Sequence, residues 1–144
     1  MLLIEQALSQ YGDGVTVARA MERWLQIRDE NGQQIPLQFV QNPDRWEQEA
    51  LYKEIRRQQH LGRPVRIMVL KYRKPGITTF VMGLFYLTCQ MVPGLAGYSF
   101  AHRDQGGVDL IWRIMLNYHA NFPGELAKPV KAENNNEIEW DHPH

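Results

Sequence analysis

A short stretch in the middle of the chain, L-K-Y-R-K-P-G-I-T-T at residues 70–79, combines residue types that bind phosphate. Its candidate ligands are three cations, a glycine and two hydroxyls: Lys71, Arg73, Lys74, Gly76, Thr78 and Thr79. The glycine permits a tight turn that points backbone N–H groups at an anion, and a helix starting directly after it adds the positive end of its dipole. A threonine hydroxyl supplies a ligand for Mg²⁺ if a nucleotide is bound. The predicted chemistry is therefore nucleotide phosphate binding.

The elements around this loop place it at the end of a strand. The apolar run at 64–70 predicts a strand buried on both faces, and apolar residues from 80 to 91 predict a helix that ends before Pro93-Gly94. A second strand is predicted at 95–101. This order predicts a parallel sheet with helices on its faces, an α/β fold in which ligands bind beyond the carboxyl ends of the strands.

The remaining elements are predicted from periodicity and capping signals. They are helices at 2–10 and 16–28, a turn at 29–33, a helix from Asn42-Pro43-Asp44 to Leu61, a helix capped by Asp104 and closed by Pro123-Gly124, and a short strand at 137–140. The length of 144 residues fits one domain. The uncharged stretch 76–101 is interrupted by proline and glycine, so we expect a buried helix there and not a membrane span.

Charge is distributed unevenly although the net charge is zero. Residues 55–103 hold eight basic and no acidic side chains, while both flanking regions are acidic. Two interpretations fit this pattern equally well. One is an anion site in the middle of the chain, and the other is a basic surface neutralised by the acidic flanks. By strict pattern, the loop fails the motif G-x-x-x-x-G-K-[ST], because Lys71 occupies the first glycine position and Ile77 the lysine position. Lys71 is then the first replacement for the missing cation, and Arg73 the second.

The stretch V-L-K-Y-R-K-P-G-I-T-T-F resembles the deviant Walker A loop of the large terminase subunit of tailed phages, the ATP-driven motor that packages DNA. The segments Q-E-A-L-Y-K-E-I, S-F-A-H-R, N-F-P and N-N-N-E-I-E-W-D support it in the same order. The resemblance covers residues 38–144 and implies the front part of a P-loop ATPase domain with a partial parallel sheet. Residues 1–37 are then an N-terminal helical segment.

The resemblance also implies roles for individual residues, with ATP and Mg²⁺ as cofactors. Lys71, Arg73, Lys74 and Gly76 would hold the phosphates, Thr78 would bind Mg²⁺, and Thr79 would lie beside it. Gln48 is the candidate for recognising adenine, and Gln41 is the second choice. The implied partners are double-stranded DNA, the portal protein and the small terminase subunit, with a homo-oligomer for the full-length protein, no membrane, and the host cytoplasm as the compartment.

The sequence departs from that family in one important respect. No apolar strand ending in paired acids, as in a Walker B motif, follows the loop, and no nuclease domain is present among the 144 residues. We therefore expect nucleotide binding without turnover, which leaves open whether this chain is an enzyme. The alternative function is a non-enzymatic nucleic-acid-binding α/β module that uses the basic region 55–103, and a third is a structural α/β segment without a ligand.

Overall fold

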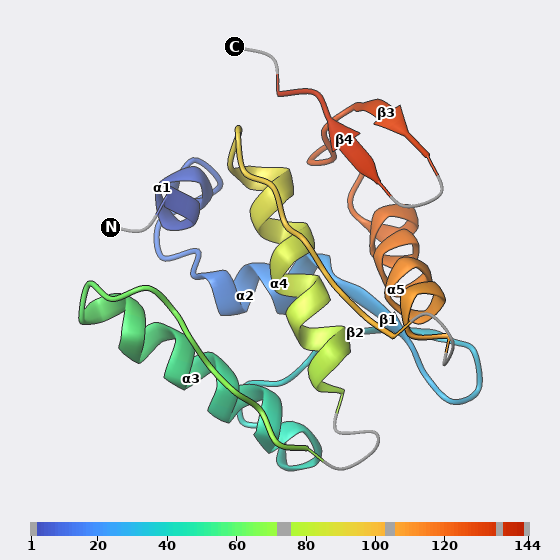
Figure 1. Ribbon diagram of the computed structural model, residues 1–144. Coiled ribbons are helices and arrows are strands. Elements are labelled where there is room, and N and C mark those ends of the chain that lie inside the picture. The colour runs from blue at the N-terminus through green and yellow to red at the C-terminus, as the bar shows by residue number, and fades with distance from the viewer. Residues whose placement is uncertain (1–2, 72–75, 103–105, 135–136, 143–144) are drawn as a thin grey trace.

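The computed structural model describes residues 3–71, 76–102, 106–134 and 137–142. Over these residues it contains five α-helices, one 3-10 helix and four short strands (Figure 1). In chain order the elements are α1 (Leu3–Ser9), α2 (Val17–Trp24), β1 (Gln26–Arg28), β2 (Gln34–Pro36), η1 (Pro43–Arg45), α3 (Trp46–His60), α4 (Ile77–Met91), α5 (Gly107–Asn121), β3 (Val130–Glu133) and β4 (Ile138–Trp140).

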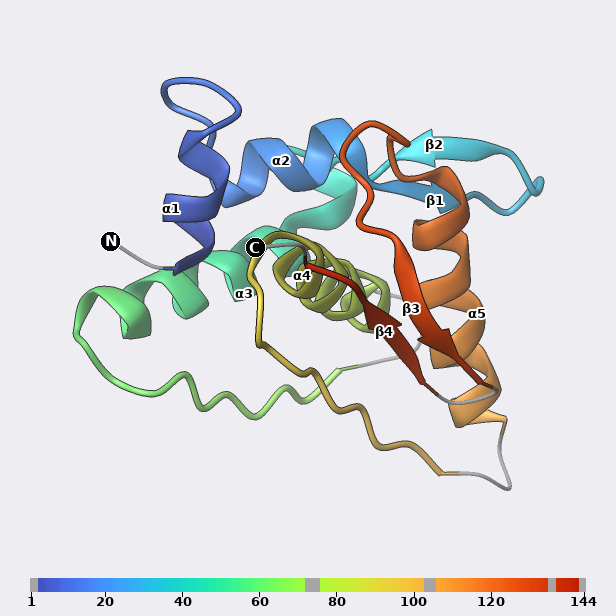
Figure 2. The same cartoon turned by 90° about the horizontal axis from the view of Figure 1, so that it is seen from above.

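Helix α4 lies at the centre of the molecule. Figure 2 shows it nearly end-on, with α1, α2 and α3 on one side and α5 on the other, while the extended stretch 92–102 passes along α4 and the stretch 61–71 passes along α3. No charged residue occurs along its fifteen positions, so no face of the helix favours water. Its side chains Phe80, Tyr86 and Leu87 are fully buried. The helix predicted before Pro93-Gly94 is thereby confirmed, and it forms the axis of the core.

Helices α4 and α5 approach closely at a glycine. A Cβ atom on Gly83 would lie 3.0 Å from the Tyr118 hydroxyl oxygen and 3.0 Å from Leu25 Cδ1. The Tyr118 hydroxyl donates a hydrogen bond of 2.7 Å to the Thr79 carbonyl, one turn earlier on α4. A larger side chain at position 83 would push the two helices apart, so this glycine sets their separation.

Aromatic rings fill the core at both ends of α4. Near its C-terminus, Tyr86 packs edge-on against Phe122 at 5.3 Å and against Trp140 at 5.5 Å between ring centroids, which joins α4 to α5 and to β4. Near its N-terminus, Phe80 packs against Phe39 at 5.0 Å. Such pairs add to the free energy gained by burying the rings. The segment before α3 and the C-terminal hairpin are therefore both attached to α4.

The helical segment predicted from Asn42-Pro43-Asp44 begins there as the 3-10 helix η1, and α3 follows from Trp46. The Asn42 side chain accepts a hydrogen bond from the Asp44 amide, Pro43 opens η1, and the helix ends at His60 before Gly62. The Arg56 guanidinium donates to the Glu5 carboxylate, which ties α3 to α1. The first turn of α3 is attached separately to the start of α4, through the hydrogen bond from Gln48 to the Gly76 carbonyl.

The strands form two antiparallel hairpins. The prediction of a mixed α/β chain is therefore confirmed, whereas the predicted parallel sheet does not occur among the described residues. β1 pairs with β2 with Ile27 opposite Ile35, around the predicted turn at 29–33, and β3 pairs with β4. The prediction of one helix over 16–28 is wrong at its end, because α2 stops at Trp24 and β1 follows. The prediction that Asp104 caps the next helix lies outside the described residues.

The strands predicted at 64–70 and 95–101 are not formed. Both stretches are extended, yet neither belongs to a sheet among the described residues. Nearly all their side chains are exposed, although burial on both faces was predicted for 64–70. Met68 is 98% and Leu70 is 102% exposed. A strand needs hydrogen-bonding neighbours, and the described part of the chain provides none here. Within that part, no helix is long and apolar enough to cross a membrane.

We predict that Gly83→Leu lowers the free energy of unfolding by about 1–3 kcal/mol, because overpacking displaces Tyr118 and Leu25. Urea denaturation monitored by circular dichroism measures the change. Gly124→Leu is the matched control, since a Cβ there meets no atom within 4 Å, and its effect should stay within about 0.5 kcal/mol. Equal effects of the two substitutions would contradict the close approach of α4 and α5.

We also predict that the protein loses stability at alkaline pH through two buried tyrosines. Burial raises the pKa of Tyr86 and of Tyr118 far above the ordinary value. The stabilisation is therefore complete below the unfolded pKa of about 10 and declines as the pH rises above it. Tyrosinate absorbance and circular dichroism, recorded together, should show the buried pair Tyr86 and Tyr118 ionising only with unfolding. Ionisation of all tyrosines near pH 10 in a folded chain would contradict this.

Candidate functional site

The N-terminus of α4 is formed by a glycine in the left-handed conformation. Gly76 has φ 70° and is the N-cap residue, and its carbonyl accepts the Phe80 amide at 2.9 Å. Glycine has no side chain that could cap the helix. No described residue accepts a hydrogen bond from the backbone amides of the first turn, residues 77–79. These amides and the helix dipole make this end attractive to a negatively charged group.

A buried glutamine from α3 reaches this helix end. Gln48 is 1% exposed, and its Nε2 donates a hydrogen bond of 3.1 Å to the Gly76 carbonyl. A Cβ atom on residue 76 would overlap Gln48 Nε2, so this contact requires glycine in addition to the positive φ. The Gln48 Oε1 atom has no hydrogen-bond partner among the described residues. A buried acceptor without a partner costs free energy, which makes it a sign of a site for a ligand.

Arg45 adds a positive charge at the same point. A Cβ atom on Gly76 would lie 3.0 Å from Arg45 Nη1, so the guanidinium group touches the start of α4. Arg45 is half-buried and makes no ion pair with a described residue. Sequence reasoning missed Arg45, although one signal was available. It precedes Gln48 by three residues within the helix predicted from Asn42-Pro43-Asp44, a spacing that in a helix places both side chains on one face.

The structure brings only some of the predicted ligands together. Gln48 and Gly76 are in contact, and the half-buried Thr78 and Thr79 follow in the first turn of α4. Lys71 is exposed and makes no hydrogen bond or ion pair with a described residue. The predicted ligands Arg73 and Lys74 lie outside the described residues. Gln41, the second candidate for adenine, is exposed, and its amide donates to Glu49 at 3.1 Å.

The acid Glu49, in the first turn of α3, is not suited to activating water. Hydrogen bonds from the Lys53 side chain and from the Gln41 backbone amide lower the pKa of Glu49. This carboxylate therefore stays ionised, and its oxygens already accept hydrogen bonds from these two groups. No group of three or more metal-ligating side chains occurs in the described part of the chain. The arrangement of amides, guanidinium and glutamine can hold an anion, whereas a general base for hydrolysis is not part of it.

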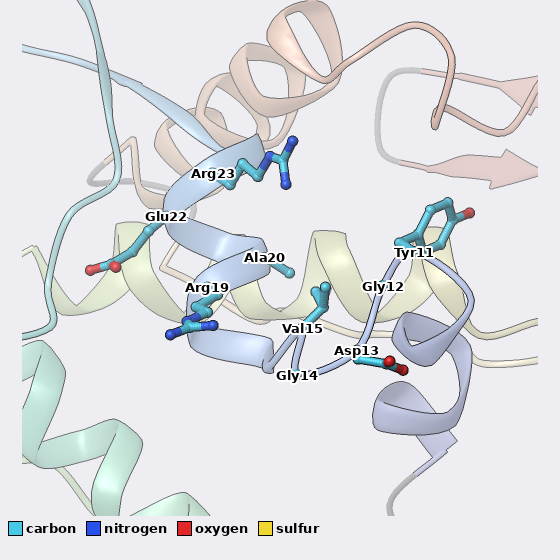
Figure 3. A pocket seen from close by; sticks show the side chains of 9 residues that line it. All are labelled: Tyr11, Gly12, Asp13, Gly14, Val15, Arg19, Ala20, Glu22 and Arg23. Atoms are coloured by element: carbon cyan, nitrogen blue, oxygen red, sulfur yellow. The ribbon is translucent and has the colours of Figure 1, made fainter.

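Two hollows on the surface lie away from this helix end. The larger, of about 540 Å³, lies between the loop 11–15 and α2, and Figure 3 shows its lining side chains. There Arg19, Glu22 and Arg23 project in different directions, so their polar groups do not converge on one point. The smaller, of about 330 Å³, is lined by Glu22 and residues near Gln41. Glu22 already accepts the Phe39 and Val40 amides there.

No family model, curated protein or solved structure matches the chain. The chemistry of the site therefore has to be argued from its own residues. They are the uncapped first turn of α4, the half-buried Arg45, and the buried Gln48 with an unused acceptor. Together they define a candidate anion site beside one buried hydrogen-bond acceptor.

We predict that Gln48→Leu leaves the free energy of unfolding unchanged or raises it by about 0.5–2 kcal/mol. The substitution removes an unpartnered Oε1, and the Gly76 carbonyl keeps its bond from Phe80. The control is Gln90→Leu at the other fully buried glutamine, whose Oε1 accepts the Lys128 amide at 2.9 Å. Loss of that bond should cost about 1–3 kcal/mol. A loss at position 48 as large as that at position 90 would show that Oε1 is satisfied.

Proposed function

We propose that the start of α4 binds the phosphates of ATP, and that the chain is a nucleotide-binding segment of a viral DNA-packaging motor of the terminase large-subunit type. The observation that carries the binding site is the contact of buried Gln48 with Gly76 at an uncapped helix N-terminus. The motor assignment is supported by the resemblance of the residues around the loop. Within this proposal the stretches 64–70 and 95–101 correspond to strands of such a domain's parallel sheet, which would need hydrogen-bonding neighbours that the described residues do not supply.

Each group has a distinct role in this proposal. The amides of residues 77–79 and the Arg45 guanidinium bind phosphate oxygens, and Lys71 completes the positive charge. An acceptor oxygen repels phosphate but fits an amino group, so Gln48 Oε1 would face the amine of adenine. The Thr78 hydroxyl is the candidate ligand for Mg²⁺, an ion that prefers oxygen donors and would neutralise phosphate charge. These residues hold a triphosphate, and translocation of double-stranded DNA into a procapsid would require further components, among them portal protein and small subunit.

A specific observation also supports nucleic-acid binding by the basic region 55–103. Two of its arginines are already paired, Arg56 with Glu5 and Arg57 with Glu54. Arg63, Arg66 and Lys71 lie exposed along the extended stretch and have no ion pair with a described residue. A row of unpaired cations suits a phosphate backbone. DNA affinity that falls with salt and ignores nucleotide would favour this second function.

We predict that a non-hydrolysable ATP analogue with Mg²⁺ raises the melting temperature of the wild-type chain. Ligand at a hundred times its dissociation constant stabilises the folded state by about 2.7 kcal/mol. Arg45→Ala and Lys71→Ala should each remove most of the shift, because each deletes a cation facing the phosphates. Differential scanning fluorimetry over a nucleotide titration measures it.

The charge-matched control is Lys131→Ala, whose side chain pairs with Glu139 on the C-terminal hairpin, at the opposite end of α4. It should retain the full shift. No change in melting temperature at millimolar nucleotide would exclude the proposed site. A shift that Lys131→Ala abolishes equally would indicate a nonspecific effect of charge.

A further inference from the structure

Two apolar stretches of the chain have the conformation of strands without strand partners. In the stretch 64–70, Val65, Ile67 and Val69 are 36–43% exposed, whereas Met68 and Leu70 are fully exposed. This alternation has the period of two that defines a β-strand. Few monomeric proteins leave apolar side chains in such a row uncovered.

The stretch 95–101 alternates in the same way. Gly97 faces α4, since a Cβ there would lie 3.4 Å from Phe85 Cδ2, and the Ser99 hydroxyl donates to Met82 Sδ at 3.2 Å. Tyr98 and Phe100 point outward and are 77% and 93% exposed. Each stretch therefore has an apolar outer face, made of Met68 and Leu70 in one and of Tyr98 and Phe100 in the other.

The arrangement of the two stretches is that of neighbouring parallel strands joined by a helix. Both run in the same direction over the same side of the layer formed by α3 and α4 (Figures 1 and 2). No backbone hydrogen bond joins them, nor does either pair with another described strand. A strand–helix–strand unit of this kind normally forms part of one sheet. Here helix α4 is present, but the backbone hydrogen bonds that would join the two stretches are absent.

One edge of the stretch 64–70 is already occupied, which leaves the opposite edge open. Gln58 of α3 accepts the Arg66 amide at 2.8 Å and donates to the Arg66 carbonyl at 3.3 Å. Since backbone groups of alternate residues in an extended chain point to opposite edges, those of Ile67 and Val69 point away from α3. These groups have no hydrogen-bond partner among the described residues. They form an edge able to accept another strand.

We propose that this open edge and its apolar outer face bind an extended segment of a partner polypeptide by β-strand addition, with apolar residues at alternate positions and acidic residues at the ends. The charge argues for acidic ends, because Arg63, Arg66 and Lys71 lie exposed along this edge and residues 55–103 contain no acid. The same charges oppose pairing between two copies. An antiparallel pair centred on Ile67 would place Arg63 opposite Lys71, and like charges opposite each other are destabilising. Backbone hydrogen bonds between the peptide and the open edge would supply affinity. Contacts of alternate side chains of the peptide would supply specificity.

The test uses a synthetic peptide of about nine residues, alternating valine and threonine with glutamate at each end. Hydrogen exchange followed by NMR should show the Ile67 and Val69 amides slowed at least about tenfold by the peptide. A peptide with a central proline should have no effect, and one with lysine ends should bind more weakly. Ile67→Pro should lower affinity about tenfold, because it removes a donor from the open edge. Met68→Pro is the matched control, since its amide points to the other edge, and its affinity should stay within about twofold.

Three results would overturn the proposal. The first is no change in exchange at millimolar peptide. The second is equal binding of the peptide with the central proline, which would indicate nonspecific apolar contact. The third is a dimer in analytical ultracentrifugation that protects the same amides without peptide, which would make a second copy the occupant. If Ile67→Pro fails to fold, exchange of the wild-type chain with the peptide set decides alone. Nucleotide protection is measured separately and does not depend on these outcomes.

Discussion

The need to keep water from a fully uncharged helix organises this molecule. Helix α4 has no charged side chain, so each neighbouring element contributes a covering surface: α5 through Tyr118, the segment before α3 through Phe39, and the C-terminal hairpin through Trp140. Gly83 lets α5 come close enough to make that cover tight. Burial of large side chains is the main favourable term in folding, and here it is concentrated on one axis.

The candidate site is a consequence of this packing. Covering α4 near its start brings the first turn of α3 against Gly76, which buries Gln48 and places Arg45 beside it. A polar side chain in that position leaves one acceptor unsatisfied, although an apolar residue of similar size would fill the space. Residues that lower stability without improving packing are typical of functional sites. The site therefore combines a packing contact with unused hydrogen-bonding capacity.

Features that depend on neighbouring residues could be predicted from the sequence. Asn42 and Pro43 mark the start of the helix that contains α3, Pro93-Gly94 marks the end of α4, and apolar periodicity places α5. Family resemblance assigned Gln48 and Gly76 to one nucleotide site but did not predict their direct contact, and Arg45 was missed because its role depends on tertiary packing. The stretch 64–70 has the composition of a buried strand. Composition cannot tell whether a strand finds a partner, since pairing is a property of distant parts of the chain or of another molecule.

The two hydrogen bonds between the Gln58 side chain and the Arg66 backbone have a consequence for the time course of folding. The two residues are eight positions apart, so these bonds can form as soon as α3 forms. Short loops and helices form in roughly a microsecond or less, well before contacts between distant segments are complete. The apolar stretch 64–70 would thus have one edge occupied during the interval when partly folded chains are most prone to aggregate. The Gln58 side chain would therefore cover one edge of the stretch 64–70 during folding and leave the opposite edge available to a partner.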